Sequence, residues 1–132
     1  MAARLKTYAA LKKQLDRVFS EWTRRRLADS RGMVRCVSCG TVKHWKEQQC
    51  GHFVTRARLA TRWEPQNTAP QCVGCNMFKQ GNAIGYSRWL LNRYGQSIFA
   101  ELDELSRKPV KFSRADLAAM IEEYQGKLAR LT

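Results

Sequence analysis

Two Cys-x-x-Cys pairs limit what this chain can fold into more than any other feature. They are Cys36-Val-Ser-Cys39 and Cys72-Val-Gly-Cys75. Each turn directs two thiolates at one metal ion, and two such turns complete a closed, structural zinc site. A redox-active Cys-x-x-Cys pair would be expected next to a βαβ unit, which this sequence does not indicate. A redox role would also leave the second Cys-x-x-Cys pair unexplained. We therefore predict one structural Zn²⁺ held by four ligands, Cys36, Cys39, Cys72 and Cys75.

The charge of the chain points to a polyanionic partner. Its 132 residues carry a formal net charge of +13. Residues 1–35 hold ten Lys and Arg against three acids, residues 36–82 hold six against two, and residues 83–132 hold eight against six. The basic excess thus lies in the N-terminal segment and the cysteine region, and nucleic acid is the leading partner.

The composition also argues against a membrane protein. No apolar run approaches the roughly 20 residues that span a bilayer. The N-terminal residues lead into a charged, periodic stretch and not into an apolar signal segment. We expect a cytoplasmic protein with no membrane partner, whose reduced thiols bind metal and do not form disulfides.

Apolar residues at steps of three and four predict a helix over residues 5–28. The stripe comprises Leu5, Tyr8, Leu11, Leu15, Val18 and Trp22, and the opposite face is rich in Lys and Arg. We define residues 1–32, which end at Gly32, as a basic amphipathic helical arm. The stripe also has an a/d-like spacing of about two heptads, so packing on the domain and dimerisation both remain open.

The rest of the chain predicts a small α+β core followed by helices. Residues 36–70 are irregular, with short strands such as 51–55, and a polar turn covers residues 76–82. A helix then runs to about Tyr94 and ends at Gly95. Residues 96–132 hold a short helix over 97–105, a capping box at Ser113–Asp116 and a last helix. Its predicted apolar face is Leu117, Met120, Ile121, Tyr124, Leu128 and Leu131.

The cysteine region resembles a known family. The motifs fall in the order Cys36-Val-Ser-Cys39, Gln49-Cys50-Gly51-His52-Phe53, Thr61-Arg62-Trp63, Asn67, Gln71-Cys72-Val-Gly-Cys75-Asn76 and Gly81-Asn82. This order resembles the phage NinG/Rap recombination endonucleases, within the HNH or ββα-metal nucleases that include endonuclease VII. The resemblance covers residues 33–95. It implies a zinc-stapled ββα-metal, treble-clef-like core with flanking N- and C-terminal helices, in a phage protein of the bacterial cytoplasm.

The resemblance also implies an activity and a set of site residues. The activity is metal-dependent hydrolysis of phosphodiester bonds in branched DNA, namely Holliday junctions and D-loops. His52 would be the general base, because an ordinary histidine pKa of about 6.5 leaves it neutral near pH 7. Asn67 would orient the loop that bears the histidine. Asn76, together with His52, would form the site of a catalytic Mg²⁺ or Mn²⁺.

One position departs from the pattern of this family. Enzymes similar to endonuclease VII place an acidic metal ligand directly before the histidine, where this chain has Gly51. Glu47, Gln49, Cys50 or a backbone carbonyl could complete the site, His52 could bind the metal alone, or the site could be inactive. The alternative function is therefore a non-catalytic, zinc-dependent nucleic-acid-binding module. A protein-interaction adaptor is the third class, which the net charge disfavours.

The remaining residues of interest divide into cations and packing residues. Trp63 and Cys50 are expected to pack, and His44 is expected to be a solvated surface residue. Symmetric cleavage of a junction needs two active sites, so a homodimer is possible. The residues expected to contact DNA are Arg56, Arg58, Arg62, Lys79, Arg24, Arg25 and Arg26.

Overall fold

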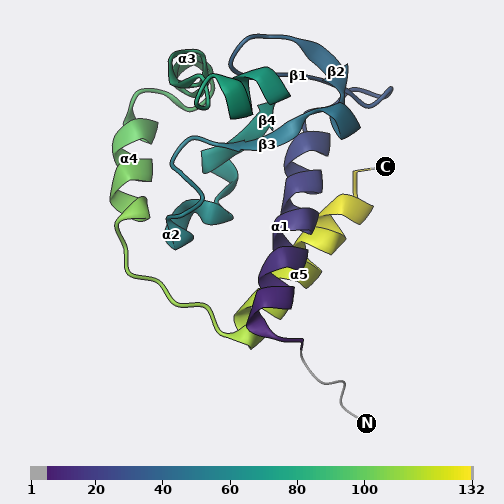
Figure 1. Ribbon diagram of the computed structural model, residues 1–132, viewed down its shortest axis with the longest axis vertical. Helices are drawn as coiled ribbons and strands as arrows, with labels where there is room; N and C mark the ends of the chain where they lie inside the picture. Colours follow the sequence, from purple (N-terminus) through teal and green to yellow (C-terminus); the bar gives the residue numbers. More distant parts are fainter. Residues whose placement is uncertain (1–5, 132) are drawn as a thin grey trace.

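The computed structural model describes residues 6–131 and has the α+β composition that the sequence predicts. Two small antiparallel sheets lie at one end of a group of helices (Figure 1). The strands are β1 (Met33–Arg35), β2 (Val42–His44), β3 (Gln49–His52) and β4 (Thr68–Gln71). The helices are α1 (Tyr8–Arg25), α2 (Leu59–Arg62), α3 (Ala83–Tyr94), α4 (Ser97–Ser106) and α5 (Arg114–Ala129). A π-helical turn, Gly74–Phe78, precedes α3.

Each sheet is one antiparallel pair of strands. In the first, Met33 lies opposite His44. In the second, Gln49 lies opposite Gln71 and His52 lies opposite Thr68. The predicted strand over 51–55 is therefore displaced, because β3 ends at His52 and the chain turns away to form a loop. A main-chain hydrogen bond of 3.0 Å from Val37 N to Pro70 O joins the two sheets.

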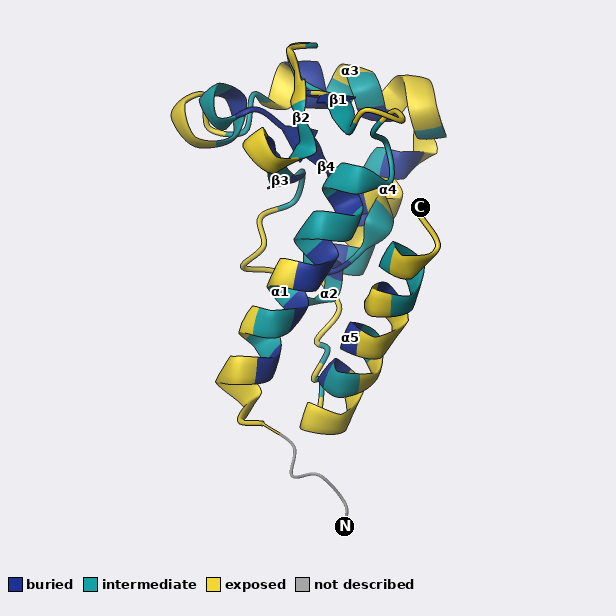
Figure 2. Ribbon diagram, turned by 90° about the vertical axis from the view of Figure 1, so that its right-hand side faces the viewer, coloured by how far each residue is buried: buried dark blue, intermediate teal, exposed yellow. Residues whose placement is uncertain are grey.

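Helix α1 packs its predicted apolar stripe against α5. The Thr7 hydroxyl caps its first turn by accepting from Ala10 N. The buried faces of α1 and α5 turn toward each other (Figures 1 and 2). Tyr8 is exposed at the start of the helix, Trp22 is half-buried, and Leu5 lies outside the described residues. This first core contains Leu11, Leu15, Val18, Phe19, Trp63, Leu117, Ile121 and Tyr124.

A second core lies between the β3–β4 sheet and helices α3 and α4. It contains Ala69, Tyr86, Leu90, Ile98 and Leu102. The β3–β4 sheet is thus held by two apolar clusters, since Cys50 packs against the first core and Ala69 belongs to the second. This arrangement fixes the strand on which the predicted catalytic histidine lies.

The predicted helix ends agree with the structure at most positions. Gly95 follows α3 with φ of +86°, a conformation that glycine adopts without strain. The capping box of α5 is present, with Ser113 and Asp116 exchanging hydrogen bonds. The placement of Leu131 on the apolar face of the last helix is wrong, because α5 ends at Ala129 and Leu131 is exposed. Within residues 6–131, the helices are too short or too polar to cross a membrane.

Arg26 ties α1 to the segment before β4. Its Nη2 donates to the carbonyl oxygens of Pro65 and Thr68, each at 2.8 Å, and its guanidinium lies 4.5 Å from the Trp22 ring centroid. Burial lowers the pKa of Arg26. The expectation that this cation contacts DNA is corrected by these contacts, since the donor groups face into the protein.

Replacement of Arg26 by Met should destabilise the protein by about 2–3 kcal/mol, because two buried carbonyl groups lose a charged donor. Arg25→Met is the matched control, since the same charge is lost from a partly exposed pair with Glu21, which contributes under about 1 kcal/mol. Urea unfolding of both variants measures the difference. Equal losses would show that the Arg26 contacts contribute nothing beyond charge.

Candidate active-site cleft and four-cysteine centre

The four predicted cysteines come together at one point. Their Sγ atoms all lie within 4.8 Å of one another, and the Cys39 and Cys72 sulfurs are 3.7 Å apart. A tetrahedral zinc ion with Zn–S distances of about 2.3 Å separates its sulfurs by roughly 3.8 Å. Cys36 and Cys72 directly follow β1 and β4, so the centre joins the ends of both sheets. The predicted cluster is confirmed, and it could bind a metal ion such as zinc.

The thiols of this centre have unlike environments. Hydrogen bonds from Thr41 lower the pKa of Cys39 to about 6, while burial raises the pKa of Cys75 to about 12. A metal ion would compensate the charge of several thiolates held at this distance, because metal ligation requires the deprotonated form. Cys50 is not part of the group, and burial raises its pKa to about 11. The expectation that Cys50 packs as a small apolar residue fits its contact with the first core.

A separate cleft of about 500 Å³ contains the predicted catalytic residues His52 and Asn76. It lies between α1, the end of β3 and the loop that follows Cys75. The remaining lining residues are Asp16, Phe19, Ser20, Cys50, Phe53, Thr55, Arg56, Gln80 and Gly81. Histidine and asparagine, 24 positions apart in the sequence, therefore face one cavity.

His52 is held in one tautomer. Its Nε2 lies 2.9 Å from the main-chain carbonyl oxygen of Arg62. A carbonyl only accepts, so Nε2 carries the proton and Nδ1 of the neutral ring is left as an acceptor. Burial lowers the pKa of His52, and the hydrogen bond to Arg62 opposes this shift. The ring is consequently neutral at pH 7 and able to take up a proton.

Asn67 lies behind the cleft and not in it. Its side chain is fully buried. Its Oδ1 accepts from Val54 N at 2.8 Å, and its Nδ2 donates to the carbonyl oxygens of Val54 and Thr61, each at 3.0 Å. These bonds tie both parts of the loop that follows His52. The role of Asn67 in orienting this loop for catalysis stays a prediction.

The position of Gly51 has no room for a side chain. A Cβ atom there would overlap the side chain of Gln71, which is buried and donates at 2.7 Å to both Ser38 Oγ and the carbonyl of Gly81. An acidic residue before His52 is therefore excluded by a buried amide. Among the residues considered as substitutes, Gln49 contacts the site, because Asn76 Nδ2 donates to its Oε1 at 2.8 Å. Glu47 is exposed and does not line the cleft.

Asp16 lines the cleft but is not among the site residues that the sequence predicts. It is the single acid among the described residues that line the cleft, and it comes from α1, outside the resembling region. Its carboxylate accepts from Arg62 Nε at 3.0 Å and from Arg62 Nη2 at 2.6 Å. It also accepts from Trp63 Nε1 at 3.0 Å. An isolated acid within the basic, periodic stretch of residues 1–20 was the available signal.

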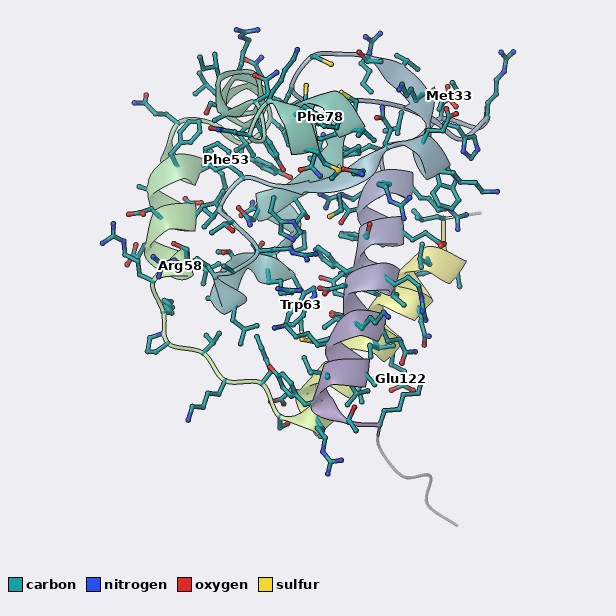
Figure 3. All side chains as sticks on the ribbon, in the orientation of Figure 1. Met33, Phe53, Arg58, Trp63, Phe78 and Glu122 are labelled. Atoms are coloured by element: carbon teal, nitrogen blue, oxygen red, sulfur yellow. The ribbon has the colours of Figure 1, made fainter. Side chains whose placement is uncertain are left out.

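The predicted DNA-contacting cations have different surroundings. Arg56, Arg58 and Lys79 are exposed, and Arg56 also lines the cleft. Arg58 lies directly before α2 (Figure 3). The expectation for Arg62 is corrected, since its side chain is only 11% exposed and bound to Asp16. Arg24 donates to the Ser20 and Trp45 carbonyls, and Arg25 pairs with Glu21.

The packing expected for Trp63 and the solvated position expected for His44 have different outcomes. Trp63 is 5% exposed and belongs to the first core, as predicted. His44 is half-buried and not simply solvated, because its Nδ1 accepts from Lys46 N at 3.2 Å and its ring lies beside Trp45. Neither residue lines the cleft or belongs to the cysteine centre.

Comparison with known proteins agrees with these motifs. A family model described as "Bacteriophage Lambda NinG protein" matches residues 2–132. The chain is 32% identical over 120 residues to each of the proteins named ninG from Escherichia phage lambda, Salmonella phage P22 and Escherichia phage 933W. These matches cover 90% of this chain but only 56–57% of the relatives, so the chain spans little more than half their length. No solved structure matches. The chain belongs to the NinG family of bacteriophage proteins.

Proposed function

We propose that this protein is a metal-dependent DNA endonuclease that hydrolyses phosphodiester bonds in branched recombination intermediates, with His52 as its general base. The observation that carries the proposal is the placement of His52 in one cleft with Asn76, with Nε2 bound to a carbonyl and Nδ1 left as an acceptor. Such a group accepts a proton from a water molecule as that water attacks phosphorus.

The order of elements supports the HNH assignment. Strand β3 ends at His52, the antiparallel strand β4 follows, and the turn that bears Asn76 leads into α3. The family resemblance implies this arrangement. It consists of two strands followed by a helical segment, with histidine on the first strand and asparagine on the helical segment. Asn67 holds the loop between the two strands.

The catalytic cation, Mg²⁺ or Mn²⁺, would be held by Asn76. Its Oδ1 has no donor within the described part of the chain, and an amide oxygen suits a hard cation that keeps several of its waters. His52, the other ligand that the resemblance implies, is left as the base in this proposal, because its one acceptor nitrogen, Nδ1, cannot bind the cation and accept a proton in the same step. When bound, the cation would supply positive charge to the scissile phosphate and the leaving oxygen. The protein residues hold the base, exclude bulk water on the α1 side and position the DNA backbone.

Asp16 acts as a positioning residue in this proposal. Its carboxylate fixes the guanidinium of Arg62, and the main-chain carbonyl of the same residue fixes His52. Arg62 Nη1 also donates to the carbonyl of Arg56 at 3.0 Å, so the cleft rim belongs to the same network. Helix α1 thereby controls the orientation of the base from outside the cysteine region.

The four-cysteine centre would hold structural Zn²⁺. The observed sulfur spacing and the absence of an open ligand position both fit a closed tetrahedral site. The metal would join the β1–β2 turn to the start of the Asn76 turn. Zinc would therefore stabilise the fold and keep Asn76 opposite His52.

Branched DNA is the proposed partner, on three grounds. The net charge is +13, the exposed Arg56 lines the cleft while Arg58 and Lys79 are also exposed, and the family resemblance implies Holliday junctions and D-loops. Contacts to phosphates give affinity without sequence readout. A homodimer is part of the proposal, since symmetric cleavage needs two sites. Light scattering that detects monomer at every protein concentration would remove this part.

Cleavage of a labelled four-way junction and of its matched linear duplex tests the proposal. With Mg²⁺ or Mn²⁺ the protein should cut the junction preferentially, and without added divalent metal it should not cut. His52→Gln keeps a donor for the Arg62 carbonyl but removes the base, so the rate should fall at least about 10²-fold. His44→Gln, which changes the other histidine outside the cleft, should retain activity.

Other outcomes separate the alternatives. Equal cutting of both substrates would keep the nuclease and discard branch selectivity. Tight, salt-dependent binding with no cutting under either metal would favour the non-catalytic nucleic-acid-binding module, with Gly51 as the reason. Binding that does not depend on salt would contradict a DNA partner.

The pH dependence of cutting should report on His52. Burial lowers the pKa of His52, so the ring stays neutral even at pH values just below the ordinary histidine pKa. The cleavage rate should therefore fall only as the pH drops through this lowered pKa. Asp16→Asn removes a negative charge that raises this pKa, so the acid limb should move to lower pH. The plateau rate should also fall about tenfold through looser positioning. Asp103→Asn, in an exposed pair with Arg107, is the control. An unchanged acid limb in Asp16→Asn would contradict the coupling.

The purified chain should contain one zinc ion. Cys39→Ser should lose the ion and melt at a lower temperature, because metal binding contributes directly to folding. Cys50→Ala, which keeps an apolar side chain at the first core, should retain the zinc, since this thiol lies outside the cluster. Elemental analysis and circular dichroism measure the two properties. A metal-free protein with unchanged melting would contradict the zinc assignment.

A further inference from the structure

Large apolar side chains are exposed beside the cleft. Phe78 is 79% exposed and Met77 is 62% exposed, at the end of the π-helical turn (Figure 3). The same loop supplies Asn76, Gln80 and Gly81 to the cleft wall. Met77 and Phe78, which we call the apolar tip, therefore directly follow the proposed metal ligand Asn76 in the sequence.

Main-chain hydrogen bonds close the loop behind Met77 and Phe78. Lys79 N donates to the Gly74 carbonyl at 3.0 Å, and Gly81 N donates to the Cys75 carbonyl at 2.9 Å. Three successive residues, Gln80, Gly81 and Asn82, have φ of 50°, 83° and 42°. For residues other than glycine this conformation costs roughly 1–2 kcal/mol each. The chain thus turns sharply directly after Lys79, and Phe78 stands exposed just before this turn.

The charges around the tip indicate what covers it. Lys79 follows Phe78 directly and is exposed, and Arg56 lines the same cleft. An apolar group flanked by cations matches a base step flanked by phosphates, because bases present apolar faces between charged backbones. Side chains such as Phe and Met insert between bases and unstack them at a cost of a few kcal/mol. That cost is lowest where stacking is already interrupted.

We propose that Phe78, assisted by Met77, inserts against an unstacked base step at the branch point of the DNA, next to the phosphate held in the cleft. The proposal rests on the proposed nuclease function and names the feature of the substrate that it recognises. Because Asn76 and Phe78 belong to the same π-helical turn, this recognition is joined directly to the proposed metal ligand. DNA with interrupted stacking, and not uniform duplex, would then bring the scissile phosphate to His52.

Binding measured without cleavage tests this inference. The full chain is titrated, in Ca²⁺ in place of Mg²⁺, into a four-way junction that carries 2-aminopurine at the branch and into a matched duplex. Binding of the wild type should raise the 2-aminopurine fluorescence. Phe78→Ala should weaken junction affinity roughly tenfold, abolish the fluorescence rise and leave duplex affinity unchanged. Phe78→Trp should restore both.

Leu91→Ala is the matched control. This residue is 45% exposed on α3 and lies outside the loop, so junction binding should not change. The inference would be overturned if Phe78→Ala bound the junction as tightly as the wild type. It would also be overturned if this variant lost self-association, because Phe78 would then contact a second copy of the chain. A fluorescence rise in a wild type that cuts no DNA would remove the nuclease proposal and keep the base-step contact.

Discussion

The antiparallel pairing of β3 with β4 positions both centres of this protein. At one end of the pair, His52 lies opposite Thr68 and enters the cleft. At the other end, Gln71 leads directly into Cys72 and the turn that bears Asn76. Tyr86 of α3 donates to the Gly51 carbonyl at 2.9 Å, which holds the helix on the strand. A displacement of this register by one residue would direct His52 away from Asn76.

Helix α1 completes the site from outside the motif region. It contributes Phe19 to the wall of the cleft and Asp16 to the network around Arg62. The guanidinium of Arg26 lies farther along the same helix and holds the segment before β4. The N-terminal helix is thus part of the site, and its basic residues serve folding as much as any contact with DNA.

The sequence predicted the parts that depend on local pattern. The cysteine cluster follows from the ligand spacing, and the ends of α3 and α5 follow from Gly95 and the capping box. It did not predict Asp16, because the pairing of that residue with Arg62 joins positions far apart in the sequence. Nor could it assign Arg26 to the interior, since a cation on a basic helix gives no sign of the carbonyl groups that it meets.

The lack of an acid directly before His52, where this chain has Gly51, has a consequence for how a cation would bind in the proposed nuclease. The space before His52 is filled by Gln71, and the one acid that lines the described cleft is neutralised by Arg62. The ligands that the described cleft offers to a divalent cation are therefore neutral, and none of them carries an unpaired negative charge. Hard cations bind weakly to such sites unless another anion is present. In the proposed nuclease the phosphate of the DNA supplies that charge, so cation and DNA would bind together. Contacts that select the DNA, including those of Phe78, would then also determine when the cation is held.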